Sequence, residues 1–274
     1  ALHVTGRRED GYHEIETLVV FTAFGDRVSA SKAERDSFEV TGPFARDVPL
    51  DKANLVLMAR DRLREEIGGR AHPVAITLEK NLPVASGVGG GSSDAAAALR
   101  ALAGLWGMDG GAALARIGVA LGADVPMCLS ARPLIARGIG ERIEGLGRMP
   151  RLSLVLANPM LALATPAVFA ALKSRSNPPM PAIAGTDLAH LASLLSYLGN
   201  TRNDLEAAAA QIAPDTREVL ASLWDAGAPL ARMSGSGATC FGIFETPKAA
   251  AAAAAAIRER RPAWFVAATE TCAA

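Results

Sequence analysis

The order of hydrophobic and polar residues changes its period along the first half of the chain. Period-two alternation, or a short apolar run between turn residues, predicts β-strands at residues 2–5, 14–24, 26–31, 37–41 and 74–78. Apolar residues at helical spacing, followed by stop signals, predict helices at residues 53–67, 93–105 and 111–121. Short strands and longer helices therefore share this half.

The second half mixes the same two elements with more helix. The pattern predicts strands at residues 152–156, 231–233 and 264–268, and helices at residues 166–172, 187–198, 204–212, 215–226 and 249–257. The proline-rich residues 173–184 are expected to form a loop or linker. Because strands and helices do not alternate regularly, we expect an α+β fold rather than a doubly wound parallel sheet. The pattern of residues changes near Arg148, which predicts two domains, residues 1–148 and 149–274.

Composition narrows the partners. The 274 residues hold 28 basic and 28 acidic side chains, so no overall field draws the chain to nucleic acid or to an anionic membrane. Three distant cysteines and four scattered histidines have no zinc or disulfide spacing. With no visible signal peptide, this cysteine usage favours a cytoplasmic protein.

One uncharged stretch, residues 152–172, is long enough to cross a bilayer. Pro159 and Pro166 would interrupt such a helix twice. We therefore expect a buried strand, a loop and then a helix, and no membrane span.

The densest chemical signal is the stretch PVASGVGGGSS at residues 83–93. It lacks the lysine of a P-loop and the third glycine of a dinucleotide fingerprint. A glycine-serine loop that leads into a helix N-terminus still suits a phosphate, because glycines permit close approach and the helix start attracts anions. Ser92 and Ser93 are expected to cap the helix or to offer hydroxyls, and Asp94 to point away. A flexible turn with a serine cap and no ligand is the alternative.

These residues resemble a known family. Residues 83–96 resemble the second motif of the galactokinase, homoserine kinase, mevalonate kinase and phosphomevalonate kinase superfamily, and the triple glycine and double serine are most similar to its 4-diphosphocytidyl-2-C-methyl-D-erythritol kinase family. Four further stretches agree with that family, at residues 4–14, 54–56, 121–126 and 233–238. The resemblance covers nearly the whole chain.

The resemblance implies two α+β domains with the active site in the cleft between them. It implies ATP-dependent phosphorylation of the 2-hydroxyl of 4-diphosphocytidyl-2-C-methyl-D-erythritol, in the non-mevalonate route to isoprenoid precursors. The expected cofactors are ATP and Mg²⁺, the ion held by the phosphates, water and Ser92 or Ser93. The only expected partner is this small molecule with its cytidine diphosphate group, and the oligomeric state stays open.

The resemblance also assigns residues. Asp124 is the expected general base, with a helix cap before Val125-Pro126 as the alternative. Tyr12 and Phe169 are expected to sandwich the cytosine while His13 hydrogen-bonds it, with core packing as the alternative for both rings. Thr165 is a further substrate residue or an N-cap.

The resemblance places further residues around ATP. They are Pro83, Val84, Ala85, Ser86, Gly87, Val88, Gly89, Gly90, Gly91, Ser92, Ser93, Asn54 and Lys80. Lys80 could instead be a solvated strand end. Residues 234–237 are expected to shape the cleft near the phosphates or to form only a tight hairpin. In the pair Asn203-Asp204, which could reach the substrate, a helix cap is favoured for Asp204.

One departure from the family concerns a lysine. The family has a Lys-x-Asn-Leu segment just before the strand that opens this chain, so either a segment is missing in front of Ala1, which we expect, or the protein is impaired. Two other functions are the alternatives to this kinase activity: a superfamily kinase acting on homoserine or a mevalonate derivative, and a non-catalytic nucleotide-binding protein.

Overall fold

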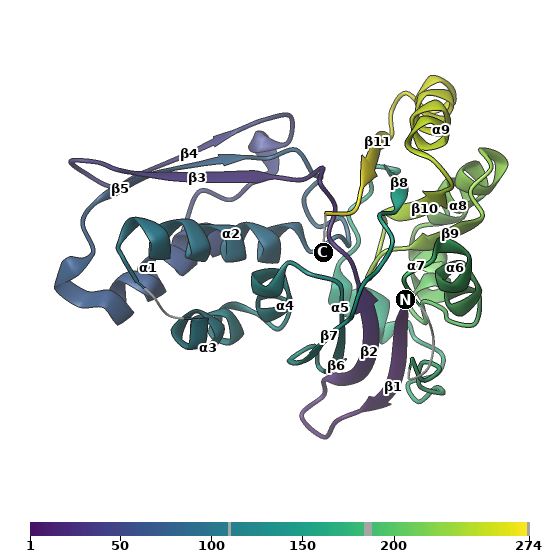
Figure 1. Ribbon diagram of the computed structural model, residues 1–274, viewed down its shortest axis with the longest axis horizontal. Helices are drawn as coiled ribbons and strands as arrows, with labels where there is room; N and C mark the ends of the chain where they lie inside the picture. Colours follow the sequence, from purple (N-terminus) through teal and green to yellow (C-terminus); the bar gives the residue numbers. More distant parts are fainter. Residues whose placement is uncertain (109–110, 184–187, 273–274) are drawn as a thin grey trace. The chain divides into compact units, whose positions relative to one another are not determined.

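The computed structural model describes residues 1–108, 111–183 and 188–272, which form two compact units (Figure 1). The first unit combines Ala1–Phe24, Ala85–Val88 and Arg132–Ala274, and the second combines Gly25–Val84 and Gly89–Ala131. The chain passes between the units within the glycine stretch, because residues 85–88 belong to the first unit and Gly89 onward to the second.

The second unit is a small sheet with helices on it. Its strands lie in the order β3 (Arg27–Lys32), β5 (Val74–Glu79) and β4 (Ser37–Thr41). Alternate residues of β5 are buried, as period-two patterning predicts. Its helices are α1 (Leu55–Ile67), α2 (Gly90–Leu105), α3 (Gly111–Leu121) and α4 (Val125–Ser130), with short turns η1 (Ala45–Asp47) and η2 (Gly68–Arg70). Helix α2 packs on β3 and on α1 (Figure 1).

Two antiparallel sheets build the described part of the first unit. One has the order β1 (Leu2–Arg7), β2 (His13–Val19), β6 (Leu134–Gly138) and β7 (Arg142–Gly145). The other has the order β11 (Phe265–Glu270), β8 (Ser153–Asn158), β10 (Cys240–Phe244) and β9 (Leu230–Met233). Every residue of β8 is buried, which explains why its sequence is apolar without alternation.

The helices of the first unit lie in the connections of the second of these sheets, α5 to α8 between β8 and β9 and α9 between β10 and β11. They are α5 (Thr165–Ala170), α6 (Leu191–Gly199), α7 (Glu206–Ile212), α8 (Asp215–Asp225) and α9 (Pro247–Arg260). Helix α9 contains the alanine run and begins where the Thr246 side chain accepts from the Ala249 N–H. The buried face of α9 packs against β11 and β8 (Figure 1).

The α+β class is confirmed, but the compact units do not divide at residue 148. Strands β1 and β2 pair with β6 and β7 rather than with the sheet of the second unit, so the first 24 residues join the later part of the chain. Long-range strand pairing of this kind leaves no mark in local patterning.

Several boundaries also differ from expectation. The pattern missed β6 and β7, because β6 is a short run after a proline and β7 is largely exposed and charged. Strand β2 ends at Val19, five residues before the expected end, and α2 begins at Gly90 instead of Ser93. The expected start of α6 at residue 187 lies outside the described residues, within which the helix begins at Leu191.

The uncharged stretch 152–172 forms β8, a loop and α5, as the two prolines predicted. Within the described residues, the helices are too short or too polar to cross a bilayer.

Candidate active site

The glycine stretch leads directly into a helix N-terminus, as the sequence predicted. Gly89 is the N-cap of α2 with a left-handed φ of +67°, and Gly90 is the first helical residue. A glycine takes this backbone conformation at little cost. The first N–H groups of α2 have no intrahelical acceptor and face the capped end, so the turn offers donors and positive dipole charge to an anion.

The expected serine cap is wrong, because Gly89 occupies that position and no side chain caps the helix. Ser92 and Ser93 lie inside the first turn instead, and Ser93 donates to the Cys128 sulfur at 3.4 Å. Neighbouring protein shields this thiol and raises its pKa to about 11, so it stays protonated.

The first part of the stretch packs on the turn between β9 and β10. The Ser234 hydroxyl donates to the Gly87 carbonyl at 2.9 Å, and the Thr239 N–H donates to the Ser86 carbonyl at 3.1 Å. A Cβ on Gly87 would lie 2.4 Å from the Gly237 oxygen. Residues 234–237 therefore form the tight hairpin that was one of the two interpretations, and this hairpin also holds the glycine stretch, while a role near the phosphates stays a prediction.

The Asn203 side chain fixes the same turn through hydrogen bonds to its backbone. Its Nδ2 donates to the carbonyls of Met233 and Gly235, at 2.9 and 2.8 Å, and its Oδ1 accepts from the Leu205 N–H. The expected cap by Asp204 is wrong, because Leu205 is the N-cap of α7 and no side chain caps that helix.

Lys80 is not the solvated strand end that its position suggested. It is buried at the end of β5, and its Nζ donates to Asp26 at 2.5 Å and to Asp94 at 2.9 Å. Burial is the main cause that raises the pKa of Asp94 to about 6, while the Lys80 charge opposes it. Asp94 thus points into the protein, as expected.

Asn54 is buried and caps α1. Its Oδ1 accepts from the Val56 N–H at 2.8 Å and its Nδ2 donates to the Pro49 carbonyl at 2.8 Å. An Asn directly before an apolar helical repeat is a strong signal for a helix cap, although the family resemblance assigned Asn54 only to ATP.

Asp124 precedes α4 but does not cap it with its side chain. Within the described residues its carboxylate has no hydrogen bond or ion pair, and the residue is exposed by surface area. Surrounding protein atoms nevertheless desolvate the group enough to raise its pKa above the ordinary value. A carboxylate that is held by no other protein group and has an increased affinity for protons suits a general base.

The aromatic residues assigned to the cytosine lie in the first unit. Tyr12 is 61% exposed in the turn between β1 and β2, which excludes core packing. The His13 ring stacks on Phe169 of α5 at a centroid distance of 4.8 Å. His13 Nε2 is buried without a hydrogen-bond partner, and desolvation lowers the pKa of the ring, so the imidazole is neutral. An unpartnered buried nitrogen beside an aromatic ring is a strong indication of a polar ligand.

Thr165 is the first residue of α5, whose N-cap is Ala164, so the expected cap by Thr165 is wrong. Its hydroxyl shares a hydrogen bond of 2.8 Å with the Ser236 hydroxyl. This bond joins the start of α5 to the turn that supports the glycine stretch.

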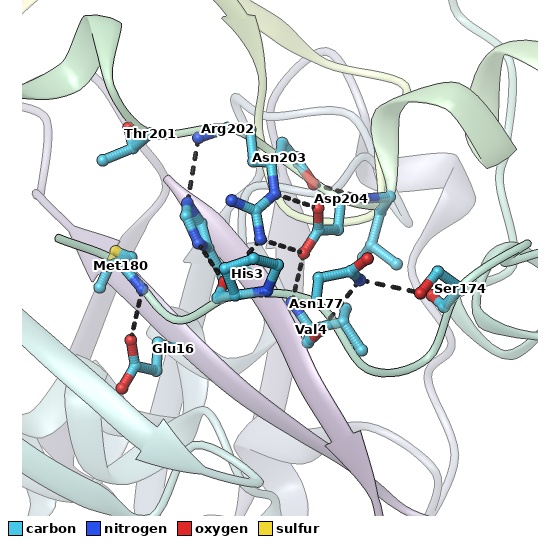
Figure 2. Close-up of polar contacts among 12 residues, drawn as sticks. His3, Val4, Glu16, Ser174, Asn177, Met180, Thr201, Arg202, Asn203 and Asp204 are labelled. Atoms are coloured by element: carbon cyan, nitrogen blue, oxygen red, sulfur yellow. Dashed lines mark hydrogen bonds and ion pairs between the residues drawn. The ribbon is translucent and has the colours of Figure 1, made fainter.

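A polar network that the sequence analysis missed fixes the chain after α5 (Figure 2). The Arg202 N–H donates to His3 Nε2 at 3.1 Å, so Nδ1 bears the proton and donates to the Pro178 carbonyl at 3.1 Å. Asp204 accepts from the Val4 N–H at 2.7 Å and from the Arg202 side chain. An isolated histidine in a strand gives no sequence signal for such a network.

Two more contacts tie the same segment to the first sheet (Figure 2). The Asn177 side chain donates to the Val4 carbonyl at 3.0 Å, and Glu16 accepts from the Met180 N–H at 2.7 Å. The proline-rich residues that follow α5 are therefore fastened to β1 and β2, the strands that are joined by the turn containing Tyr12.

Possible ligands for a metal ion are few in the described part of the chain. Among the residues that the structure describes, His, Cys, Asp and Glu side chains form no group of three that could hold an ion. The hydroxyls of Ser92 and Ser93 are hard oxygen donors of the kind that Mg²⁺ accepts, so they fit an ion whose other ligands are phosphate and water.

Comparison with known families matches two parts of the chain. Residues 54–132 match the GHMP kinases N terminal domain, and residues 180–263 match the GHMP kinases C terminal domain. A 4-diphosphocytidyl-2-C-methyl-D-erythritol kinase of Mesorhizobium japonicum is 58% identical over 99% of this chain and 92% of the relative. A relative of the same name from Chelativorans sp. is 57% identical over the same shares.

Solved structures agree. A crystal structure of a 4-(cytidine 5'-diphospho)-2C-methyl-D-erythritol kinase is 34% identical, with a TM-score of 0.82 over 100% of this chain and 96% of that one. A homoserine kinase from Cytophaga hutchinsonii has a TM-score of 0.68 at 21% identity, over 96% of this chain and 88% of that one, and so shares the fold.

Proposed function

This chain belongs to the 4-diphosphocytidyl-2-C-methyl-D-erythritol kinases within the GHMP kinase family, and on that premise we propose which residues bind its substrates and which one takes the proton. It is a small-molecule kinase, a phosphotransferase that uses ATP and an alcohol acceptor. The proposed acceptor is the 2-hydroxyl of 4-diphosphocytidyl-2-C-methyl-D-erythritol. The cysteines found in the described residues are all free, which suits the reducing cytoplasm that we propose as its location.

The environment of His13 is the observation that supports a cytidine-containing acceptor over other alcohols. Its Nε2 is buried and unpartnered, and its ring stacks on Phe169. A neutral imidazole nitrogen can exchange one hydrogen bond with the polar edge of cytosine, and Tyr12 and Phe169 offer faces for stacking. Thr165, at the start of the same helix as Phe169, is the proposed further contact with this substrate.

ATP is proposed to bind through residues 83–93. The glycines let phosphate oxygens approach the backbone, and the first turn of α2 supplies N–H donors and positive dipole charge. Ser92 and Ser93 would hold Mg²⁺, which supplies positive charge for the transferring phosphoryl group. Asn54 and Lys80 support the site through the protein, since their polar atoms bind protein groups.

Asp124 is the proposed general base. It accepts the proton of the acceptor hydroxyl as that oxygen bonds to the γ-phosphorus and the bond to ADP breaks. Desolvation raises the pKa of its carboxyl, which strengthens it as a base.

The test is an ADP-release assay with ATP, Mg²⁺ and 4-diphosphocytidyl-2-C-methyl-D-erythritol. We would run this chain and a version that begins with the Lys-x-Asn-Leu segment of the family. We expect ADP release that depends on the cytidine substrate, and a loss of about 10²- to 10⁴-fold in kcat for Asp124→Asn with little change in either KM. Asp47→Asn, at an exposed carboxylate of η1, is the matched control.

Other outcomes identify the alternatives. Release of ADP with homoserine or mevalonate, and none with the cytidine substrate, would show that the acceptor is wrong. ATP binding without turnover in both versions would favour a non-catalytic nucleotide-binding protein. An Asp124→Asn variant with unchanged kcat would remove this residue from the chemistry.

A further inference from the structure

Three charged side chains form a buried cluster in the second unit. Lys80 contacts the carboxylates of both Asp26 and Asp94, and the three side chains are only 4%, 3% and 7% exposed. Burial of charges is costly even when they are paired, and a buried ion pair adds little stability compared with apolar packing. This cost suggests a role beyond stability.

The cluster contacts the chain where the glycine stretch begins. Oδ1 of Asp26 accepts from the N–H groups of Asn81 and Leu82, at 2.6 and 2.8 Å. These two residues directly precede residues 83–93. Asp26 therefore fixes the direction in which the backbone enters the proposed phosphate loop.

The same cluster contacts the other end of the stretch. Asp94 lies in the first turns of α2 and receives the second hydrogen bond of Lys80. A Cβ on Gly90 would lie 3.2 Å from the Lys80 Nζ and 3.4 Å from Asp26 Oδ2. The cluster thus lies directly against the first residue of α2, whose N–H groups are proposed to face the phosphates.

The charge of the cluster also matters at this place. Asp94 alone would put a negative charge close to a helix N-terminus that must attract phosphate. Lys80 offsets it, so that two carboxylates and one ammonium leave a net charge of −1. Coulomb interaction over about 5–10 Å in partly shielded protein is large enough to change nucleotide affinity measurably.

We infer that the Asp26–Lys80–Asp94 cluster is a positioning device for ATP, which holds both ends of residues 83–93 and sets the charge behind the phosphate site. Lys80 and Asp94 act through the loop and the field, without contact with the nucleotide. This inference rests on the proposed function, because it requires that residues 83–93 hold the phosphates.

A series of variants separates charge from contact. Lys80→Gln makes the cluster −2, Asp94→Asn makes it neutral, and the double variant Lys80→Gln/Asp94→Asn returns it to −1. The readout is the Kd for the Mg²⁺ complex of a non-hydrolysable ATP analogue at pH 8, by calorimetry, beside the thermal unfolding midpoint. Lys32→Gln, at an exposed lysine ending β3, is the matched control.

We expect Lys80→Gln to weaken binding by about tenfold or more and the double variant to return to within about threefold of the wild type. Asp94→Asn, which is nearly isosteric, should bind as tightly as the wild type or more tightly. The midpoints should not follow this order, since both variants that lose Lys80 also lose its two buried hydrogen bonds.

Three results would overturn the inference. Equal weakening in Lys80→Gln and the double variant would mean that Lys80 contacts the nucleotide itself. Affinities that rank with the unfolding midpoints would mean a structural role only, and a folded Asp94→Asn with clearly weaker binding would contradict the charge argument. If the wild type binds no nucleotide, the proposed function fails instead.

Discussion

At the scale of single residues, the half-buried His13 combines two properties that rarely occur together. Its ring is packed against Phe169, while its Nε2 is buried without a partner. A buried polar atom normally finds a hydrogen bond within the protein, because leaving it unpaired costs about 1–3 kcal/mol. A ligand that supplies the missing bond recovers this free energy on binding, so His13 is suited to select the base.

His13→Phe should therefore raise the KM for the cytidine substrate by about 10- to 100-fold. The substitution keeps an aromatic ring against Phe169 and removes the hydrogen bond. The KM for ATP should not change. Steady-state kinetics with each substrate varied in turn would measure both values.

Tyr12→Phe is the control for His13→Phe, because Tyr12 is exposed and the change removes only a hydroxyl. Its KM values should stay near those of the wild type. If His13→Phe also leaves the KM for the cytidine substrate unchanged, His13 does not bind the base.

At the scale of elements, the loop requires a glycine at some positions and only tolerates one at others. Gly87 needs both a positive φ of +79° and the absence of a side chain, since the turn between β9 and β10 lies against it. Gly91 has neither need, because its backbone is ordinary and a Cβ would lie 3.6 Å from Leu55, at normal contact distance. One glycine is thus required by packing and the other is not.

Gly87→Ala is predicted to break the contact between residues 85–88 and the hairpin. A Cβ 2.4 Å from the Gly237 oxygen forces the backbone apart, and the positive φ adds about 1–2 kcal/mol of strain. We expect a lower unfolding midpoint and a large increase in the KM for ATP.

Gly91→Ala is the matched control for this prediction. It keeps the backbone N–H that the proposed phosphate site uses and adds the same methyl group at ordinary contact distance from Leu55. Its midpoint and its KM for ATP should stay near the wild-type values, and equal damage in both variants would contradict the packing argument.

At the scale of the whole molecule, the folding of the first unit depends on contacts between distant parts of the sequence. His3 in β1 hydrogen-bonds to the segment after α5 and to the connection that follows α6, 175 and 199 positions away (Figure 2). These bonds require a neutral imidazole with its proton on Nδ1. Desolvation lowers the pKa of His3, which agrees with that state.

The sign of the pH effect follows from linkage. The folded protein holds the His3 proton more weakly than the unfolded chain, whose histidine titrates near 6.5, so this group lowers stability as the pH falls below about 6.5. His3→Gln cannot titrate. We expect it to be about 1–2 kcal/mol less stable than the wild type at pH 8, with a gap that narrows toward pH 5.

Thermal or urea unfolding of both proteins between pH 5 and 8 measures this gap. His72→Gln is the control, because the ring of this half-buried histidine hydrogen-bonds to its neighbour Pro73 and otherwise packs edge-on against Trp106. A gap between the wild type and His3→Gln that stays constant over the whole range would show that protonation of His3 is not coupled to folding.

Much of the site was predictable because its signals are local. Each of its three motifs is short: the glycine run before a strong helix, the pair Tyr12-His13, and the carboxylate before Val125-Pro126. The resemblance of these motifs to the kinase family is confirmed. The residue roles within that family stay predictions. The helix caps were less predictable, since Ser93, Thr165 and Asp204 all have suitable side chains but each bonds elsewhere.

Neighbouring residues were enough to predict the α+β class, the helices and strands with strong periodicity, and the family, because each of these signals is local. The folded arrangement was needed to see that β1 and β2 join the later part of the chain, that Lys80 is buried between Asp26 and Asp94, and that His13 Nε2 has no partner. The physical reason is that pairing, burial and hydrogen-bond satisfaction depend on groups brought together from distant positions, which local patterning does not encode.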